Sequence, residues 1–251
     1  MDKGTQKLIM DILGNIQENK IPLAADCLEN LTSTLKNAHR GNPILFSILS
    51  SSLASIGLAT NSPTTIIGAM LLSPIGDLIT KSTIYKLFNK YTFVNHKYKR
   101  WYKTLLFVII FAVLTSFILG KLFQYIRNPV TKKKLDEEWP TKEMISRATP
   151  FDLLYMILIA AICGFALPFC LKAKNGIRVV GIGIATALIP PLANIGLSLS
   201  IDIKKKPLLK KYRKQAFYTG IAIVVVNILL LYIPSMFILD SICQNENILK
   251  S

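Results

Sequence analysis

The chain has 251 residues, of which 51% are hydrophobic and only 18% are charged. Soluble globular domains carry about 25% charged residues, so this composition argues against a soluble protein and against a disordered chain. The charges are also segregated, because Asp77 is the only charged residue in five long windows: 41–80, 104–120, 153–171, 179–201 and 215–239. A soluble amphipathic helix mixes polar and apolar residues in every turn, so this separation predicts a multi-pass membrane protein.

The formal net charge of +16 comes from short Lys and Arg clusters that lie between the apolar windows. This layout favours contact with anionic lipid headgroups at basic loops, and it does not resemble a nucleic-acid-binding surface. The lipid bilayer is therefore the expected partner, and a homo-oligomer stays open. The four cysteines and two histidines show no metal-ligand spacing, so we expect no metal site and no cofactor.

The first half of the chain predicts an arm followed by three helices. Residues 1–40 are polar with apolar residues at helical spacing, which indicates a helical N-terminal arm. The apolar window 41–80 is too long for one crossing of about 20 residues, and the turn Asn61-Ser62-Pro63 divides it. A first membrane unit at 41–123 is expected, with helices at about 43–60, 63–80 and 104–123.

A polar, charged linker is predicted at 124–148, before a second membrane unit at 149–240. The sequence Thr149-Pro150-Phe151-Asp152 is typical of a helix N-terminus, with Thr149 as the cap. The second unit is expected to contain helices at about 150–171, 177–200 and 216–239, and a C-terminal tail follows at 241–251.

The two units match at an offset of 117 residues. This offset places Ser73-Pro74 on Pro190-Pro191, Asp77 on Asn194, and the third helix on the sixth. Three crossings per unit would give the units opposite orientations, which is the inverted-repeat architecture of many secondary transporters. The expected fold is thus an all-α polytopic membrane bundle of about six transmembrane helices, built as two three-helix repeats with proline breaks in helices 2 and 5.

The proline breaks suggest a polar pathway through the bundle. A proline removes a backbone donor and frees a carbonyl, and in hydrocarbon such groups need partners in protein or water. Asparagine and aspartate near the breaks could line an interior cavity together with those carbonyls. The candidate residues are Ser73, Pro74, Asp77, Pro190, Pro191, Asn194 and Asn227.

Each candidate also has a structural interpretation. Asp77 lies four residues before Lys81 and could form an interfacial ion pair with it. The Pro190-Pro191 pair could be a packing kink, and Asn227 could join two helices by hydrogen bonds. The small residues of the first helix are more typical of a close-packing surface than of a polar path.

Three strings, LASIGLATNSPTTIIGAMLLSPIGD, GIGIATALIPPLANIGLSL and TGIAIVVVNILLLYI, carry a family resemblance. Taken in this order, over residues 45–235, they resemble domain-of-unknown-function family 389, a group of hydrophobic membrane proteins known mainly from bacteria and archaea. Members commonly have Met-Gly-Pro after the first proline, whereas this chain has Ile75-Gly76-Asp77. A role for Asp77 would therefore be particular to this chain.

Two functions follow from these features. The favoured one is a transporter or channel-like carrier of a small polar solute or ion, and the alternative is a non-transporting membrane scaffold or assembly protein. The chain has no GxSxG, P-loop or HExxH sequence, so we expect no enzyme activity and no catalytic residue.

Overall fold

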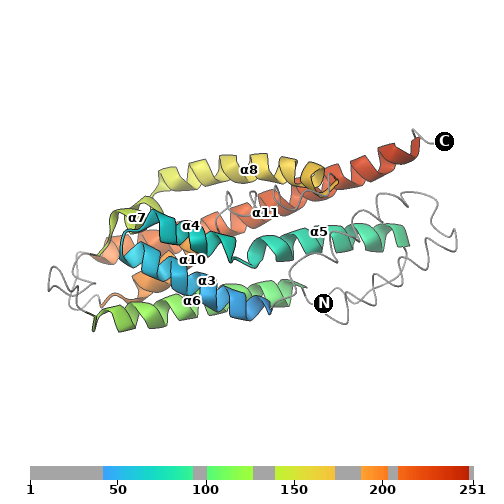
Figure 1. Cartoon of the computed structure of the whole chain (residues 1–251). Helices are drawn as coiled ribbons and strands as arrows, with labels where there is room; N and C mark the ends of the chain where they lie inside the picture. Colours follow the sequence, from blue (N-terminus) through green and yellow to red (C-terminus); the bar gives the residue numbers. More distant parts are fainter. Residues whose placement is uncertain (1–41, 93–100, 127–138, 173–187, 203–208, 249–251) are drawn as a thin grey trace.

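The computed structural model describes residues 42–92, 101–126, 139–172, 188–202 and 209–248, and it is helical with no β-strand in these ranges. The expected arm at 1–40 and the first part of the expected fifth helix, 177–187, lie outside the described residues. The helices, shown in Figure 1, are α3 (Pro43–Ala59), α4 (Pro63–Leu71), α5 (Ile75–Thr92), α6 (Trp101–Phe123), α7 (Lys142–Ser146), α8 (Pro150–Lys172), α10 (Ile189–Ser200) and α11 (Lys210–Ile248).

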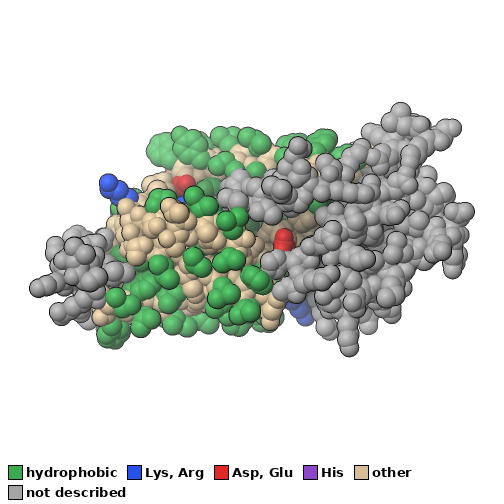
Figure 2. All heavy atoms as spheres, viewed as in Figure 1, with side chains coloured by type: hydrophobic (Ala, Val, Ile, Leu, Met, Phe, Trp, Pro, Cys, Tyr) green, Lys and Arg blue, Asp and Glu red, His purple; other side chains and the backbone are tan. Residues whose placement is uncertain are grey.

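Four helical stretches are long and apolar enough to cross a membrane: Pro63–Leu87, Trp101–Phe123, Pro150–Leu171 and Lys210–Ile242. Their outer faces carry exposed large apolar side chains, such as Leu114 and Ile118 on α6 and Ile162 and Phe165 on α8. Figure 2 shows hydrophobic side chains over much of the coloured surface, with few charged ones among them. Apolar surface of this extent is unfavourable in water, so these faces indicate a membrane protein.

Three of the expected helices are confirmed with bounds within three residues, namely α3, α6 and α8. Asn42 caps α3, because its side-chain oxygen accepts a hydrogen bond from the Ile44 amide at 3.0 Å. The expected cap of α8 is also present, since the Asp152 amide donates to Thr149 Oγ1 at 3.3 Å. Local signals for helix ends therefore predicted the structure well here.

The expected second helix is divided into α4, which ends at Leu71, and α5, which begins at Ile75 and continues to Thr92. Pro74 has no amide hydrogen, and Ser73 Oγ accepts a hydrogen bond from the Ile75 amide at 3.4 Å. The expected end near residue 80 was wrong, because the segment after Thr80 mixes polar and apolar residues that a buried helix can also contain.

Two further elements differ from the expectation. The helix expected at 216–239 is α11, which begins at Lys210 and continues through Ile248, so most of the expected tail is helical. Its 39 residues give a length of about 58 Å, which exceeds the ~30 Å hydrocarbon core. The short helix α7 lies inside the stretch expected to be a linker.

Helices α8 and α11 pack together where prolines have freed backbone carbonyls. Pro168 lies four residues after Gly164, and Ser235 Oγ of α11 donates to the Gly164 carbonyl at 2.9 Å. Pro234 likewise lies four residues after Leu230. The Leu230 carbonyl approaches Gly164 so closely that a Cβ on Gly164 would overlap the carbonyl oxygen. The missing side chain of Gly164 therefore lets α8 contact a carbonyl that Pro234 leaves without a helical donor.

The helix ends gather at two ends of the bundle. The end that contains α7, called the α7 end, also holds the C-terminal ends of α3, α6 and α10 and the N-terminal ends of α4, α8 and α11 (Figure 1). Contacts between residues agree, since Gln124 Nε2 donates to the Ser200 carbonyl at 2.9 Å. The opposite end, called the far end, holds the first residues of α3 and α6 and the last of α5, α8 and α11.

The helix α10 lies in the interior, in contact with α3, α6 and α11, and eleven of its twelve residues are buried. Small residues permit this packing. A Cβ on Gly196 would lie 2.5 Å from both Ser116 Cβ and the Val113 carbonyl oxygen, and one on Gly120 would overlap the Ser200 side chain. Such close approach through small residues is typical of helix packing in membranes.

Candidate polar pathway

The helix α5 is polar although much of it is buried. Thr80, Ser82, Thr83 and Tyr85 are all buried, and Thr83 Oγ1 donates to its own helix at the Ile79 carbonyl. The buried Ser82 hydroxyl has no hydrogen-bond partner among the described residues. The helix α3 buries as many hydroxyls, but each of them donates to a backbone carbonyl (Ser47, Ser50, Ser51 and Ser55). The Ser82 hydroxyl without a partner therefore makes α5 the helix that most resembles the lining of a polar path.

Ser73, Pro74 and Asp77 lie at the start of α5. Pro74 is buried, while Ser73 and Asp77 are partly buried. Asp77 is in the first turn of the helix, where a negative charge is stabilised by the helix dipole. Asp77 and Lys81 each make at least one interaction.

Pro190 and Pro191 occupy the first turn of α10, and both are buried. A Cβ on Gly220 of α11 would lie 3.3 Å from the Pro191 carbonyl oxygen and 2.7 Å from Ile195 Cγ1. The prolines therefore begin a buried half-length helix of about 18 Å, and its first turns pack on α11 through a glycine.

Asn194 is almost fully buried, with 1% of its surface exposed, and both ends of its amide are hydrogen-bonded. Its Oδ1 accepts from the Tyr212 hydroxyl at 2.7 Å, and its Nδ2 donates to the Met144 carbonyl of α7 at 2.9 Å. The Tyr212 hydroxyl also lies 3.4 Å from the Met144 carbonyl oxygen. Asn194 thus joins α10, α11 and α7 at the α7 end.

Asn227 lies elsewhere in the bundle. It is fully buried on α11, fifteen residues after Tyr212, and this separation corresponds to about 22 Å along the helix axis. Because Asn194 contacts Tyr212 directly, the structure does not bring Asn194 and Asn227 together. The candidate residues therefore occupy at least two locations along the bundle.

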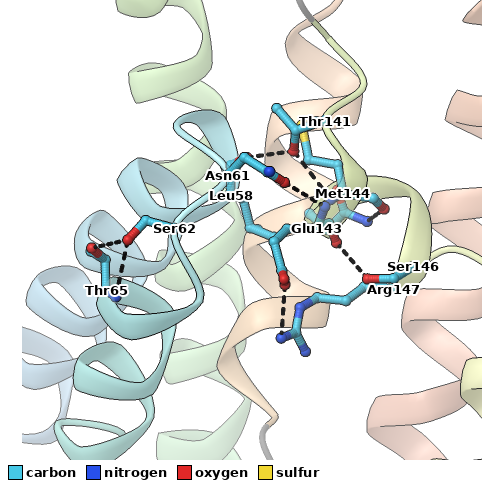
Figure 3. Close-up of polar contacts among 10 residues, drawn as sticks. Leu58, Asn61, Ser62, Thr65, Thr141, Glu143, Met144, Ser146 and Arg147 are labelled. Carbon is cyan, nitrogen blue, oxygen red and sulfur yellow. Dashed lines mark hydrogen bonds and ion pairs between the residues drawn. The ribbon is translucent and has the colours of Figure 1, made fainter.

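The α7 helix also contacts the turn between α3 and α4, as Figure 3 shows. Thr141 Oγ1 donates to the Leu58 carbonyl at 2.6 Å, and the Glu143 amide donates to Asn61 Oδ1 at 3.0 Å. Asn61 has a positive φ of 56°, and the Ser62 amide returns to the Gly57 carbonyl at 2.8 Å. This is a Schellman turn, and asparagine tolerates its left-handed position.

Charged groups surround the joint between α7 and α8. Arg147 Nη2 lies 3.4 Å from Glu143 Oε2, one helical turn away. Arg147 Nε and Asp152 Oδ2 are buried and have no hydrogen-bond partner among the described residues. Asp152 is in the first turn of α8, where the helix dipole favours a negative charge.

Sequence reasoning did not select Asn61, Thr141, Met144 or Tyr212 for a site. Asn61 was interpreted only as a turn residue, and Tyr212 lies in a basic run that was assigned to lipid contact. The contact from Met144 is made by a backbone carbonyl, which no side-chain pattern can reveal.

Comparison with known proteins adds the family. A family model described as "Domain of unknown function (DUF389)" matches residues 70–238, which is more than half of the chain. The chain belongs to the DUF389 family. Neither the curated proteins nor the solved structures contain a match to it. The matched range, 70–238, includes every candidate residue of the pathway, together with α5, α10 and most of α11.

Proposed function

We propose that this DUF389 protein is a transporter or channel-like carrier of a small polar solute or ion. The observation that carries the proposal is the polarity of α5, a partly buried helix with a carboxylate in its first turn and a Ser82 hydroxyl without a partner in the described residues. Ionisable residues inside a membrane bundle are costly and mostly serve pathways for ions or solutes. A buried hydroxyl without a partner is also suited to hydrogen-bond water or solute.

The proposal includes a six-crossing bundle of two inverted repeats. In its support, the matched helices run in opposite directions: α3 and α6 end at the α7 end, whereas α8 and α11 begin there (Figure 1). In each pair of helices, α3 with α6 and α8 with α11, a serine hydroxyl also bonds a backbone carbonyl of the other helix. Ser47 Oγ donates to the Val108 carbonyl of α6 at 2.7 Å, and Gly164 accepts from Ser235 of α11.

The first experiment measures flux in proteoliposomes against a panel of ions and small metabolites, comparing the protein with its Asp77→Asn variant. Asparagine keeps the shape of the side chain and removes the charge, so we expect a folded, inserted protein that has lost ion-coupled flux. Asp202→Asn is the matched control, because Asp202 follows α10 at the α7 end and lies outside α5. Equal flux in the parent and Asp77→Asn would exclude the assigned role of Asp77.

The alternative is a membrane scaffold or assembly protein, and one observation favours it. The Asn194 amide is satisfied by protein groups at both ends, and Asn227 lies about 22 Å away along α11 from the Tyr212 contact of Asn194. In a scaffold these amides would only join helices. The same assay separates the two functions, because a scaffold would give no flux above empty liposomes for any solute in the panel.

A further inference from the structure

Residues 139–148 form a segment, called here the strap, that closes the α7 end. It contains α7 and inserts three buried side chains into the bundle: Trp139, Met144 and Ala148, which are 5%, 0% and 2% exposed. Trp139 packs edge-on against Phe123, the last residue of α6, with ring centroids 6.3 Å apart. The strap therefore covers the helix ends at this side of the bundle.

The strap contacts both membrane units. Thr141 and the Glu143 amide bind the α3–α4 turn of the first unit, and the Met144 carbonyl accepts from Asn194 of the second. These hydrogen bonds add to the burial of Trp139, Met144 and Ala148. The helix α7 has only five residues, which is too short for a helix to be stable without its surroundings. The strap is thus held in place by its contacts with the bundle and not by a helix that is stable on its own.

The contact with Asn194 has a defined orientation. Tyr212 donates to the amide oxygen, which fixes the Asn194 side chain so that its NH2 group points toward the strap. The acceptor that it meets is a backbone carbonyl, the Met144 oxygen at 2.9 Å. When the strap moves away, a buried amide donor and its positioning tyrosine become available to another acceptor oxygen.

We propose that the strap closes the α7 end reversibly and can move away from it. In the closed state the Met144 carbonyl accepts the hydrogen bond that the Asn194 amide otherwise donates to a bound solute. When the strap moves away, the Met144 carbonyl is replaced as acceptor by an oxygen of the solute, such as a carbonyl or carboxylate oxygen, or by the oxygen of a water that hydrates the solute. The identity of the Asn194 amide as a solute contact rests on the proposed function. The displacement of the strap does not, and it is measured separately.

The test uses Met144→Cys in a full-length chain whose four native cysteines are replaced. The protein is reconstituted in liposomes and treated from both sides with a charged, membrane-impermeant thiol reagent. A strap that opens exposes this residue, so we expect Met144→Cys to react completely over minutes to hours. Ile145→Cys is the exposed control on the same helix, and Ala112→Cys is the buried control on α6; they should react at once and not at all, respectively.

Asn61→Gly provides a second variant that changes the strap contact alone. Glycine adopts the positive φ of this turn easily, so the turn is kept while the acceptor for the Glu143 amide is removed. Loss of one hydrogen bond should raise the labelling rate of Met144→Cys about fivefold. Ala112→Cys should stay unreactive in the same background.

Two results would overturn the closure. One is that Met144→Cys stays as unreactive as Ala112→Cys, both with and without Asn61→Gly. The other is that Met144→Cys and Ala112→Cys are labelled equally, which would mean general unfolding of the protein. If Met144→Cys fails to fold, hydrogen exchange replaces the labelling and compares two chains that keep Met144, the parent and Asn61→Gly. The amides at 144–148 should exchange faster in Asn61→Gly than in the parent, while the exchange of the α6 amides does not change. An unchanged exchange rate at 144–148 would also overturn the closure.

The assay also separates this inference from the proposed function. Labelling of Met144→Cys without flux of any solute would support the closure and refute the carrier. Flux with a permanently unreactive Met144→Cys would support the carrier and refute the closure. With both present, faster flux in Asn61→Gly would link them, and unchanged flux would overturn the assignment of the Asn194 amide as a solute contact behind the strap.

Discussion

At the scale of single residues, backbone carbonyls freed by proline decide several contacts. Pro168 removes the helical donor for Gly164, and Ser235 supplies a replacement from α11. We expect Ser235→Ala to leave the Gly164 carbonyl without this donor and to lower the free energy of unfolding by about 1 kcal/mol. Unfolding in lipid bicelles measures this, with Ser241→Ala as control, since the exposed Ser241 hydroxyl only bonds its own helix. Equal losses in both variants would contradict the assigned role of Ser235.

Residue identities predicted turns better than partners. Asn61-Ser62-Pro63 was expected to separate two helices, and Asn61 does occupy the left-handed position of a Schellman turn. The sequence could not reveal that its side chain accepts a hydrogen bond from Glu143, 82 residues later. Asn194 was selected as a buried polar residue, but its partners are a tyrosine in a basic run and a backbone carbonyl, and neither follows from a local pattern.

At the scale of helices, the contact of α10 with α6 depends on a missing side chain. A Cβ on Gly196 would meet Ser116 Cβ and the Val113 carbonyl at 2.5 Å, and the backbone there cannot yield without separating the helices. We expect Gly196→Ala to reduce the free energy of unfolding by about 1–3 kcal/mol. Gly68→Ala is the matched control, because its nearest contact would be Leu53 Cδ2 at 4.0 Å, and it should be neutral or slightly stabilising. A neutral Gly196→Ala would show that α10 can shift on α6.

Apolar runs and caps were sufficient to predict α3, α6 and α8, because hydrocarbon thickness and helix rise fix the length of a span. The same reasoning was insufficient for α5, α7 and α11. Polar residues continue α5 beyond Thr80, and Met144 buries α7 within an expected linker. In these segments tertiary contacts, and not apolar length, determine where the helix lies.

At the scale of the whole molecule, four exposed aromatic residues lie near the two ends of the apolar stretches of α8 and α11. Phe151 and Phe169 of α8 are separated by about 27 Å along the axis, and Tyr218 and Phe237 of α11 by about 29 Å. Both separations are close to the ~30 Å thickness of the hydrocarbon core. Tyrosine is enriched at the membrane–water interface, so we expect one surface of the bilayer near Tyr218, at the α7 end.

Three exposed lysines, Lys210, Lys211 and Lys214, lie one to two turns before Tyr218 along α11, at the α7 end. We propose that they attract anionic phospholipids, each contributing about 1 kcal/mol. Replacing all three by glutamine should lower the preference for phosphatidylglycerol over phosphatidylcholine by ~10-fold or more, as measured by lipid exchange in mixed nanodiscs. The preference of the parent protein should fall with added salt, because screening shortens the reach of surface charges.

Lys103→Gln, at the exposed start of α6, serves as the control at the far end. An unchanged preference in the triple variant would mean that the lysines do not bind the headgroups.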